Sequence, residues 1–251
     1  MANITTKWRK FMAIGCSHGK HICPKAKKAV LKFKESFNPE LSIHLGDFCD
    51  TTAFRSGARG IDADSSEPVA PDIDGGMQFL REFGADVVLC GNHEARLWTL
   101  RNSPNAVIAY ASHKAVKHIE EGCRQMKARL IPYDGIYQEL RFGDILATHG
   151  TFYNEMAARD MAEAYGSKVV FAHTHRAMQA PGRTMKHTRG YCVGTLTRKR
   201  EMSYASCRRA TMAWGMGIVA GEYREGSKPD SAIWLFEGPS ENNDTEWRLP
   251  V

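Results

Sequence analysis

A series of short apolar runs is the feature of this sequence that most constrains the fold. In chain order the runs are "FMAIG", "LSIHLG", "DVVLCG", "IYQELRFG", "DILATHG" and "SKVVFAH". Each run is too short for a buried helix and is rich in the residue types that favour strands, so each predicts a β-strand. Helical patterns separate several of the runs. This alternation indicates an α/β protein.

Two helices can be assigned from the spacing of apolar residues. The first lies between the first two predicted strands, where the apolar positions are Ala26, Val30, Phe33 and Phe37. The second is predicted over residues 154–165 and is ended by Gly166. Residues 51–71 are rich in Gly, Ser, Asp and Pro without an apolar period, which predicts a long loop.

The C-terminal part of the chain has a different pattern. The stretches "YCVGTL", "AWGMGIVAG" and "AIWLFEG" predict antiparallel strands separated by turns. After Phe236 the sequence becomes polar, which predicts a tail over residues 237–251. A chain of 251 residues with 43% hydrophobic content can bury a substantial core. We therefore expect one domain over residues 1–251, with its core at about residues 11–236.

Composition also bears on where the protein acts. No apolar run approaches the ~20 residues that cross a bilayer, and "MANITTKWRK" lacks the apolar segment of a signal peptide. The 7 cysteines are an odd number scattered along the chain, which argues against a disulfide framework. These features predict a protein of the cytoplasm with no membrane partner.

Basic residues are concentrated in one segment. The formal net charge is only +6, but residues 181–210 contain eight Arg or Lys against one acid, Glu201. Such a segment attracts polyanions such as nucleic acid, or it forms an ordinary solvated surface. Three of its residues are predicted to bind substrate: Arg198, Lys199 and Arg200.

Polar side chains of the metal-binding type follow most of the predicted strands. In chain order they are His18, Asp47, Asn92, His93, His149, His173 and His175. The carboxyl ends of strands meet at one edge of an α/β sheet, so we expect these side chains to gather there. Imidazole, carboxylate and amide donors suit Zn, Mn, Fe or Co better than Ca. The sequence therefore predicts a metal site.

The order of the motifs "GDFCD", "GNHE", "HG" and "AHTH" resembles that of the calcineurin-like metallophosphoesterase superfamily. The family pattern is D-x-H, G-D-x-x-D, G-N-H-D/E, H and G-H-x-H, and the resemblance spans about residues 11–236. The later spacing is similar to a phage and bacterial branch of uncertain substrate. The resemblance implies a four-layer αββα sandwich, in which two mixed β-sheets are flanked by helices.

The resemblance also implies a centre of two divalent metal ions, with Asp47 bridging them. One site would take Cys16, His18 and His175, and the other would take Asn92, His149 and His173. The implied reaction is in-line attack on phosphorus by a hydroxide that bridges the ions. His93 matches the acid that protonates the leaving group, and Asp50 matches the carboxylate that orients it. Arg96 is predicted to reach a phosphate oxygen, or else to be an exposed residue of a helix.

Two residues depart from the family pattern. Ala172 replaces a glycine, which matters only if the backbone there needs a positive φ. Cys16 replaces the aspartate of the first motif. As a ligand, its thiolate favours Zn or Fe over Mn. The alternatives are that Cys16 faces away from the first site, or that it forms a separate zinc site with His18, His21 and Cys23.

Three functions follow from the resemblance. The first is a metal-dependent phosphodiesterase whose partner is a phosphoester substrate, nucleic acid or nucleotide. The second is a phosphomonoesterase for proteins or small molecules. Thr51 and Thr52 weigh against a protein phosphatase, since those enzymes have Arg and Gly after the second-motif aspartate. The third is a non-catalytic binding scaffold that has lost one metal.

Overall fold

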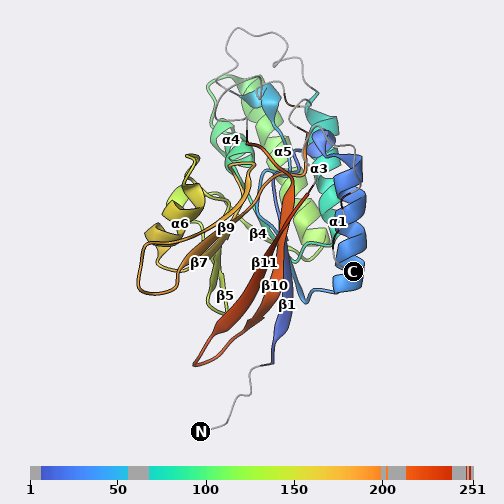
Figure 1. Cartoon of the computed structure of the whole chain (residues 1–251). Coiled ribbons are helices and arrows are strands. Elements are labelled where there is room, and N and C mark those ends of the chain that lie inside the picture. The colour runs from blue at the N-terminus through green and yellow to red at the C-terminus, as the bar shows by residue number, and fades with distance from the viewer. Residues whose placement is uncertain are drawn as a thin grey trace.

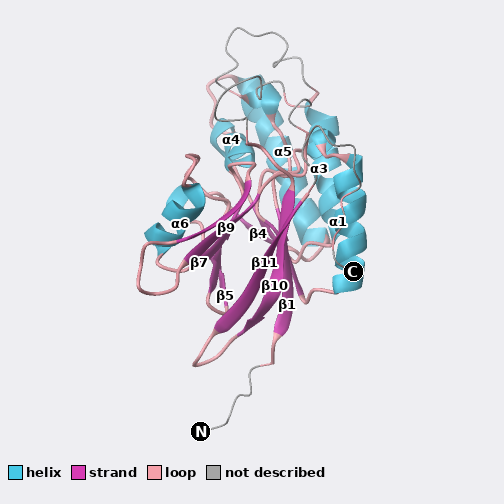
Figure 2. Ribbon diagram, viewed as in Figure 1, coloured by secondary structure: helices cyan, strands magenta, loops and turns pink. Residues whose placement is uncertain are grey.

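The computed structural model describes residues 7–55, 68–198, 202, 213–238, 247 and 249. It contains two mixed β-sheets that pack face to face, with helices on the outer face of each (Figure 1). The ribbon coloured by secondary structure shows the helices on both sides of the sheets (Figure 2). The expected four-layer sandwich is therefore confirmed.

The first sheet has six strands in the order β11-β10-β1-β2-β3-β4. Their bounds are β1 Arg9–Ile14, β2 Leu41–His44, β3 Val87–Leu89, β4 Arg129–Ile131, β10 Gly217–Arg224 and β11 Asp230–Glu237. Strands β1 to β4 are parallel, with Phe11 opposite Leu41 and Val87 opposite Arg129. Strands β10 and β11 form an antiparallel extension beside β1.

The second sheet has five strands in the order β5-β6-β7-β9-β8. Their bounds are β5 Leu140–Phe142, β6 Ile145–Ala147, β7 Lys168–Phe171, β8 Ala177–Pro181 and β9 Arg189–Val193. Strands β6, β7 and β9 are parallel, while β5 and β8 run antiparallel at the two edges.

Five α-helices complete the described layers. They are α1 Pro24–Phe37, α3 Val69–Phe83, α4 Asn92–Leu100, α5 Ala106–Gln125 and α6 Ala157–Tyr165, and short 3-10 turns lie at Gly19–His21, Thr52–Phe54 and Gly135–Tyr137. Helix α1 begins with Pro24 at a position where a missing N–H costs nothing. Helix α5 begins after Asn105, whose side-chain oxygen accepts N–H groups of the first turn. None of the described helices is long and apolar enough to span a bilayer.

Three buried clusters hold the layers together. The central cluster lies between the sheets and includes Phe11, Leu89 and Val170. A second cluster lies between the first sheet and helices α1, α3 and α5, and a third lies between the second sheet and α6. Because each sheet is covered on both faces, the site-forming loops are confined to the strand ends.

The structure corrects several expectations from the sequence. The loop expected over residues 51–71 contains a 3-10 turn and ends in helix α3, which begins at Val69; residues 56–67 lie outside the described part. Strand β9 pairs in parallel with β7 as well as antiparallel with β8. The polar tail contains Trp247, which is only 6% exposed and packs in the helix-side core of the first sheet. Helices α3 and α5 and strands β4 and β8 were not expected, and α4 was expected only in the alternative that placed Arg96 in a helix.

Candidate metal centre

The predicted donors gather at the carboxyl ends of the parallel strands of both sheets. Cys16 and His18 follow β1, Asp47 follows β2, and Asn92 begins α4 just after β3. His149 follows β6, and the pair His173 and His175 follows β7. The two sheets face each other, so the loops from their strand ends meet in one place. The parallel order of the strands explains why residues so distant in sequence become neighbours.

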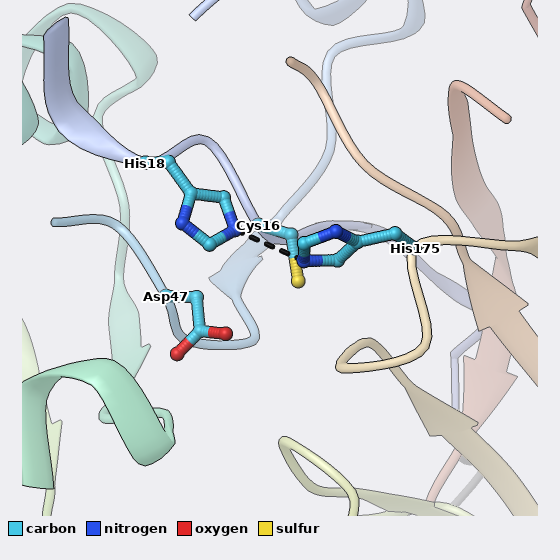
Figure 3. A group of neighbouring side chains, drawn as sticks. All are labelled: Cys16, His18, Asp47 and His175. Carbon is cyan, nitrogen blue, oxygen red and sulfur yellow. Dashed lines mark hydrogen bonds between the residues drawn. The ribbon is translucent and has the colours of Figure 1, made fainter. Parts of the chain in front are cut away.

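The first donor set consists of Cys16, His18, Asp47 and His175. All four side chains are buried, and one donor atom from each lies within 4.8 Å of the others. Figure 3 shows the two imidazoles turned toward each other, with a distance of 3.0 Å between their Nε2 atoms. Burial lowers the pKa of both histidines, with a further lowering of His175 by His18. Neutral imidazoles are the form that binds metal.

The proton on His18 can be assigned from its other nitrogen. His18 Nδ1 lies 3.0 Å from Oδ1 of Asp50. Burial opposes the charge of Asp50, but hydrogen bonds from His18 and His93 outweigh it and lower the pKa of this carboxyl. Asp50 is therefore an acceptor, Nδ1 carries the proton, and Nε2 presents a lone pair toward the first donor set. A carboxylate behind an imidazole in this way is the usual support of a metal-binding histidine.

The second donor set consists of Asp47, His149 and His173, with donor atoms again within 4.8 Å of one another. Asn92 adds an amide oxygen, Oδ1, which lies 3.1 Å from His149 Nε2 and 2.9 Å from His173 Nδ1. Asp47 belongs to both sets. The seven predicted metal donors thus form two overlapping groups that share one carboxylate.

The orientation of His149 provides a test of whether this set fits a cation. Its Nδ1 donates to the carbonyl of Leu45 at 2.8 Å, because a carbonyl can only accept. Its Nε2 then presents a lone pair toward two oxygens, Asn92 Oδ1 and Asp47 Oδ2, the latter at 3.3 Å. Burial disfavours a second proton here, but the charge of Asp47 outweighs it and raises the pKa of His149. A metal ion satisfies all three groups at once, so the donors fit one.

Five donor residues have left-handed backbone conformations that side chains other than glycine rarely adopt. They are Cys16, His18, Asp47, His173 and His175, with φ between 49° and 66°. Such conformations cost of order 1–3 kcal/mol each and concentrate at functional sites. The backbone is therefore held in a strained form at most of the positions that supply donors. Ala172 does not share this conformation among the described residues, so its methyl group is tolerated.

The sequence profile of the family described as calcineurin-like phosphoesterase matches residues 9–177, which include every donor named above. The chain belongs to this family. Its known members bind divalent metals, in agreement with the cluster of Cys16, His18, Asp47 and His175. No curated protein matches the chain in sequence.

Solved structures with a similar arrangement have very different sequences from this chain. Vacuolar Protein Sorting 29 from Cryptosporidium parvum is 10% identical with a TM-score of 0.41, and the match covers 92% of this chain and 98% of that chain. Vps29 from Chaetomium thermophilum is 13% identical with a TM-score of 0.38, covering 90% and 96%. The sulfate thiohydrolase SoxB from Thermus thermophilus is 10% identical with a TM-score of 0.36, covering 90% and 56%. These values assign no activity to the chain.

His93 and Asp50 lie beside the first donor set. His93 Nδ1 donates to the main-chain carbonyl of Asp50 at 2.5 Å, and its Nε2 lies 3.9 Å from Asp47 Oδ2. Burial opposes charging of His93, but Asp47 and Asp50 outweigh it and raise its pKa. The Asp50 carboxylate is closer to His18, at 3.0 Å, than to His93 Nδ1, at 3.4 Å. Asp50 is thus placed to support a metal donor as well as the predicted acid.

Glu94 is a supporting residue for which no role was predicted from the sequence. It is fully buried, and its carboxylate accepts the main-chain N–H groups of Asp47, Cys49 and Gly91 at 2.9, 2.7 and 2.7 Å. Burial and the nearby charge of Asp47 raise its pKa to about 7. Glu94 joins the loop after β2 to the loop after β3. Its position in "GNHE" was the available signal, but the three N–H groups that it binds could not be predicted.

Asp72 and Gln138 tie together other loops of the centre. Asp72, in the first turn of α3, accepts the main-chain N–H groups of Asp50 and Thr51 at 2.9 and 2.7 Å. Gln138 donates to the carbonyls of Cys90 and Pro132 and accepts the N–H of His149 at 2.8 Å. It therefore connects the strand ends of the first sheet to the β6 end of the second. Neither residue lies in a motif, so the sequence carried no signal for them.

The predicted cationic contacts are placed unevenly. Arg96 lies on α4, with Nη1 3.3 Å from the Asp50 carbonyl and 3.5 Å from His93 Nδ1, so it borders the site rather than pointing away from it. Arg198 is partly exposed and follows the buried Thr197. Lys199 and Arg200 lie outside the described residues.

Part of the basic segment lies away from the centre. Strand β8 leaves the metal-bearing edge and β9 returns parallel to β7, with Arg189 opposite Lys168 at the start of that strand. Arg183 sits in the connection between them and binds Glu163 of α6 at 2.9 Å. These basic residues therefore lie at the far end of the second sheet, because the hairpin carries them there.

Cys16 lies within the first donor set and is fully buried. Burial raises the pKa of its thiol, with a further increase from the charge of Asp47. Deprotonation therefore requires a cation beside it, which a coordinated metal supplies. Cys23 packs in the core between the first sheet and α1, and among the described residues it is grouped with none of the donors. A separate site made with Cys23 does not form.

Proposed function

We propose that the protein is a metal-dependent phosphodiesterase that hydrolyses phosphoester bonds of nucleotides or nucleic acid. The observation that carries the proposal is the sharing of Asp47 by two donor sets. A shared carboxylate supports a pair of ions rather than two independent ones. When bound, such a pair stabilises charge on phosphoryl oxygens and activates water as the nucleophile.

His93 is the residue that we infer to protonate the leaving oxygen. Its Nδ1 proton is fixed by the Asp50 carbonyl, which leaves Nε2 turned toward Asp47. Burial opposes charging of His93, but Asp47 and Asp50 outweigh it and raise its pKa, which favours the protonated form that an acid requires. The same main-chain contact prevents the ring from flipping, so the acidic nitrogen stays on the side of the donors.

Cys16 is the donor that we infer to set the metal preference of the first site. Its thiolate is softer than the carboxylate that it replaces, and it favours Zn or Fe over Mn. The second site has only nitrogen and oxygen donors, namely Asn92, His149 and His173 with Asp47. We therefore infer two unlike sites that share one ligand.

The charge around the centre supports a diester substrate. Among the contacts described for the site, Arg96 is the cationic side chain beside His93, and its Nη1 is also close to the Asp50 carbonyl. A phosphodiester carries one negative charge, whereas a monoester carries close to two at neutral pH. The single charge of Arg96 at this position matches that of a diester. The free, buried thiols among the described cysteines also support action in the reducing cytoplasm.

The test combines metal analysis with two substrates. Purified protein should contain two equivalents of metal and hydrolyse bis-p-nitrophenyl phosphate faster than p-nitrophenyl phosphate in Zn or Mn. Glu163→Gln, at the far end of the second sheet, is the matched control. It should leave the ratio of the two hydrolysis rates unchanged. A preference for the monoester would instead establish a phosphomonoesterase. If the purified protein contains no metal and hydrolyses neither substrate, it is a binding scaffold.

A further inference from the structure

Two aromatic rings stand against donor residues without being donors themselves. The ring centroid of Trp214 lies 4.1 Å from that of His175, with an interplanar angle of 72°. The ring centroid of Tyr133 lies 5.7 Å from that of His149 in a similar edge-to-face contact. His175 belongs to the first donor set and His149 to the second. An aromatic ring therefore lies beside each donor set, and both rings are partly exposed.

The position of Trp214 is fixed by the main chain around it. The N–H of Gly215 donates to the carbonyl of His175 at 2.8 Å, and the Gly215 carbonyl accepts the N–H of Thr195 at 3.1 Å. Thr195 in turn donates its hydroxyl to the carbonyl of Cys16 at 2.8 Å. The indole is thus attached to the loops that carry the first donor set, which limits the entropy that it loses when a ligand packs on it.

A third aromatic side chain, Tyr153, lies on the loop that follows His149 and is 75% exposed. The backbone of this loop is held in place, because Arg176 Nη1 donates to the carbonyls of Tyr153 and Asn154 at 3.4 and 2.9 Å. Arg176 directly follows His175 and is only 6% exposed. A buried arginine therefore anchors a loop at the metal-bearing edge while its large aromatic ring stays in water. Folding gains little from that ring, which makes it available to a ligand.

We propose that Trp214 and Tyr153 are stacking surfaces for unpaired nucleobases on either side of the phosphodiester that enters the centre. The proposal rests on the proposed function and specifies its substrate as a nucleotide or a single strand. Every base has a flat face, and stacking on an aromatic side chain contributes about 1–3 kcal/mol per base. Bases in a duplex are stacked on their neighbours and do not offer that face. The selected substrate is therefore unpaired.

Calorimetry with matched oligomers tests the proposal without depending on turnover. The probes are a thymidine hexamer with phosphorothioate linkages, which resist hydrolysis, and an abasic hexamer with the same linkages and charge. The thymidine hexamer should bind about 5- to 150-fold more tightly, the range that corresponds to stacking of one base. A thymidine dimer separates the two sources of the base: equal affinity indicates a nucleotide site, and affinity that grows with length indicates a strand.

Variants assign the effect to the two rings. Trp214→Ala and Tyr153→Ala should each lower the ratio of the affinities for the thymidine and abasic hexamers, whereas Trp214→Phe should keep most of that ratio. Trp8→Ala is the matched control, since Trp8 is 41% exposed and precedes β1 at the end opposite Cys16. Metal content, measured in each variant, shows whether the donor sets are intact.

Two results would overturn the proposal: equal binding of both hexamers by the unmodified protein, or an unchanged ratio in both alanine variants. Hydrolysis of bis-p-nitrophenyl phosphate keeps this failure apart from failure of the proposed function. If the protein hydrolyses bis-p-nitrophenyl phosphate but binds both hexamers equally, only the proposed stacking surfaces are rejected. If the protein binds the thymidine hexamer more tightly but hydrolyses no substrate with any metal, the catalytic function is rejected. The binding site for unpaired bases is then retained.

Discussion

The polar side chains at the two ends of β7 differ in burial: those at its start are partly exposed, and most of those beyond its end are buried. At its start, Lys168 is partly exposed, and its ammonium group lies 2.8 Å from Asp144 Oδ2. Beyond its end, His175 is buried in a left-handed conformation and faces another buried imidazole. Water solvates the charges at the first end, so the ion pair there contributes little. At the second end the polar groups depend on one another. The effect of a substitution should therefore follow burial rather than charge.

The strongest way to break this contrast is to change the carboxylate that both donor sets share. Asp47→Asn removes the charge and replaces an acceptor oxygen with an N–H donor that faces His149 or His93. We expect metal content to fall below one equivalent and hydrolysis to fall by about 10³-fold or more. Plasma emission spectroscopy and diester hydrolysis measure the two effects. Retention of two equivalents would show that Asp47 is not shared.

Changing the thiol of the first donor set should have the next largest effect. Cys16→Asp should shift the metal preference from Zn toward Mn by on the order of tenfold, since a hard carboxylate replaces a soft thiolate. Cobalt-substituted protein should show a thiolate-to-cobalt absorption band that Cys16→Asp and Cys16→Ser both lose. The same band in all three proteins would mean that Cys16 faces away from the metal.

Changing the support behind a donor should have a smaller effect than changing the donor. Asp50→Asn keeps the size of the side chain but weakens the hold on His18 Nδ1, which lies 3.0 Å from Oδ1. Loss of such a support typically costs 10–100-fold in metal affinity, and we expect about that at the first site. Competition with a zinc chelator measures the change. Equal affinities in both proteins would indicate that Asp50 acts only on His93.

The far end of the second sheet should show the smallest effect. Arg183 forms hydrogen bonds with Glu163 and lowers the pKa of that carboxyl to about 2. A lowered pKa means that the pair stabilises the fold above the ordinary value of 4.5, and that this contribution is lost as the pH falls toward 2. Glu163→Gln should lower Tm by less than about 2 °C at pH 7, and by less still at pH 3 or in high salt. A large shift at pH 7 would contradict the contrast between the two ends of β7.

The sequence was sufficient to predict which side chains gather at this edge, because their positions follow a simple rule. Most of the predicted strands in the first part of the chain are followed by a residue such as Asp47 or His149, and parallel strands bring such ends to one edge. Cys16 could be included because its place in the motif order was clear. Prediction of the centre therefore needed strand positions and the order of the motifs, but not the detailed pairing of the strands.

The supporting residues could not be predicted for a physical reason. Glu94 and Gln138 bind main-chain groups that lack partners only because of the particular shapes of the surrounding loops. The position of the basic residue Arg183 could not be predicted, because the direction of β8 and β9 decides which end of the sheet it occupies. Trp247 was missed because the few apolar residues near the end of a polar stretch form no long period that would reveal burial.

The left-handed backbone at five donor residues has a consequence for laboratory evolution of this protein. Glycine adopts that conformation without steric cost, so glycine at Cys16 or His175 would relax the chain while deleting a donor. Selection for soluble expression alone would favour such changes. The selected variants would keep the fold but lose the metal donors. Libraries sorted for heat resistance in the presence of a chelator would lose the centre first, and libraries sorted in added zinc would keep it.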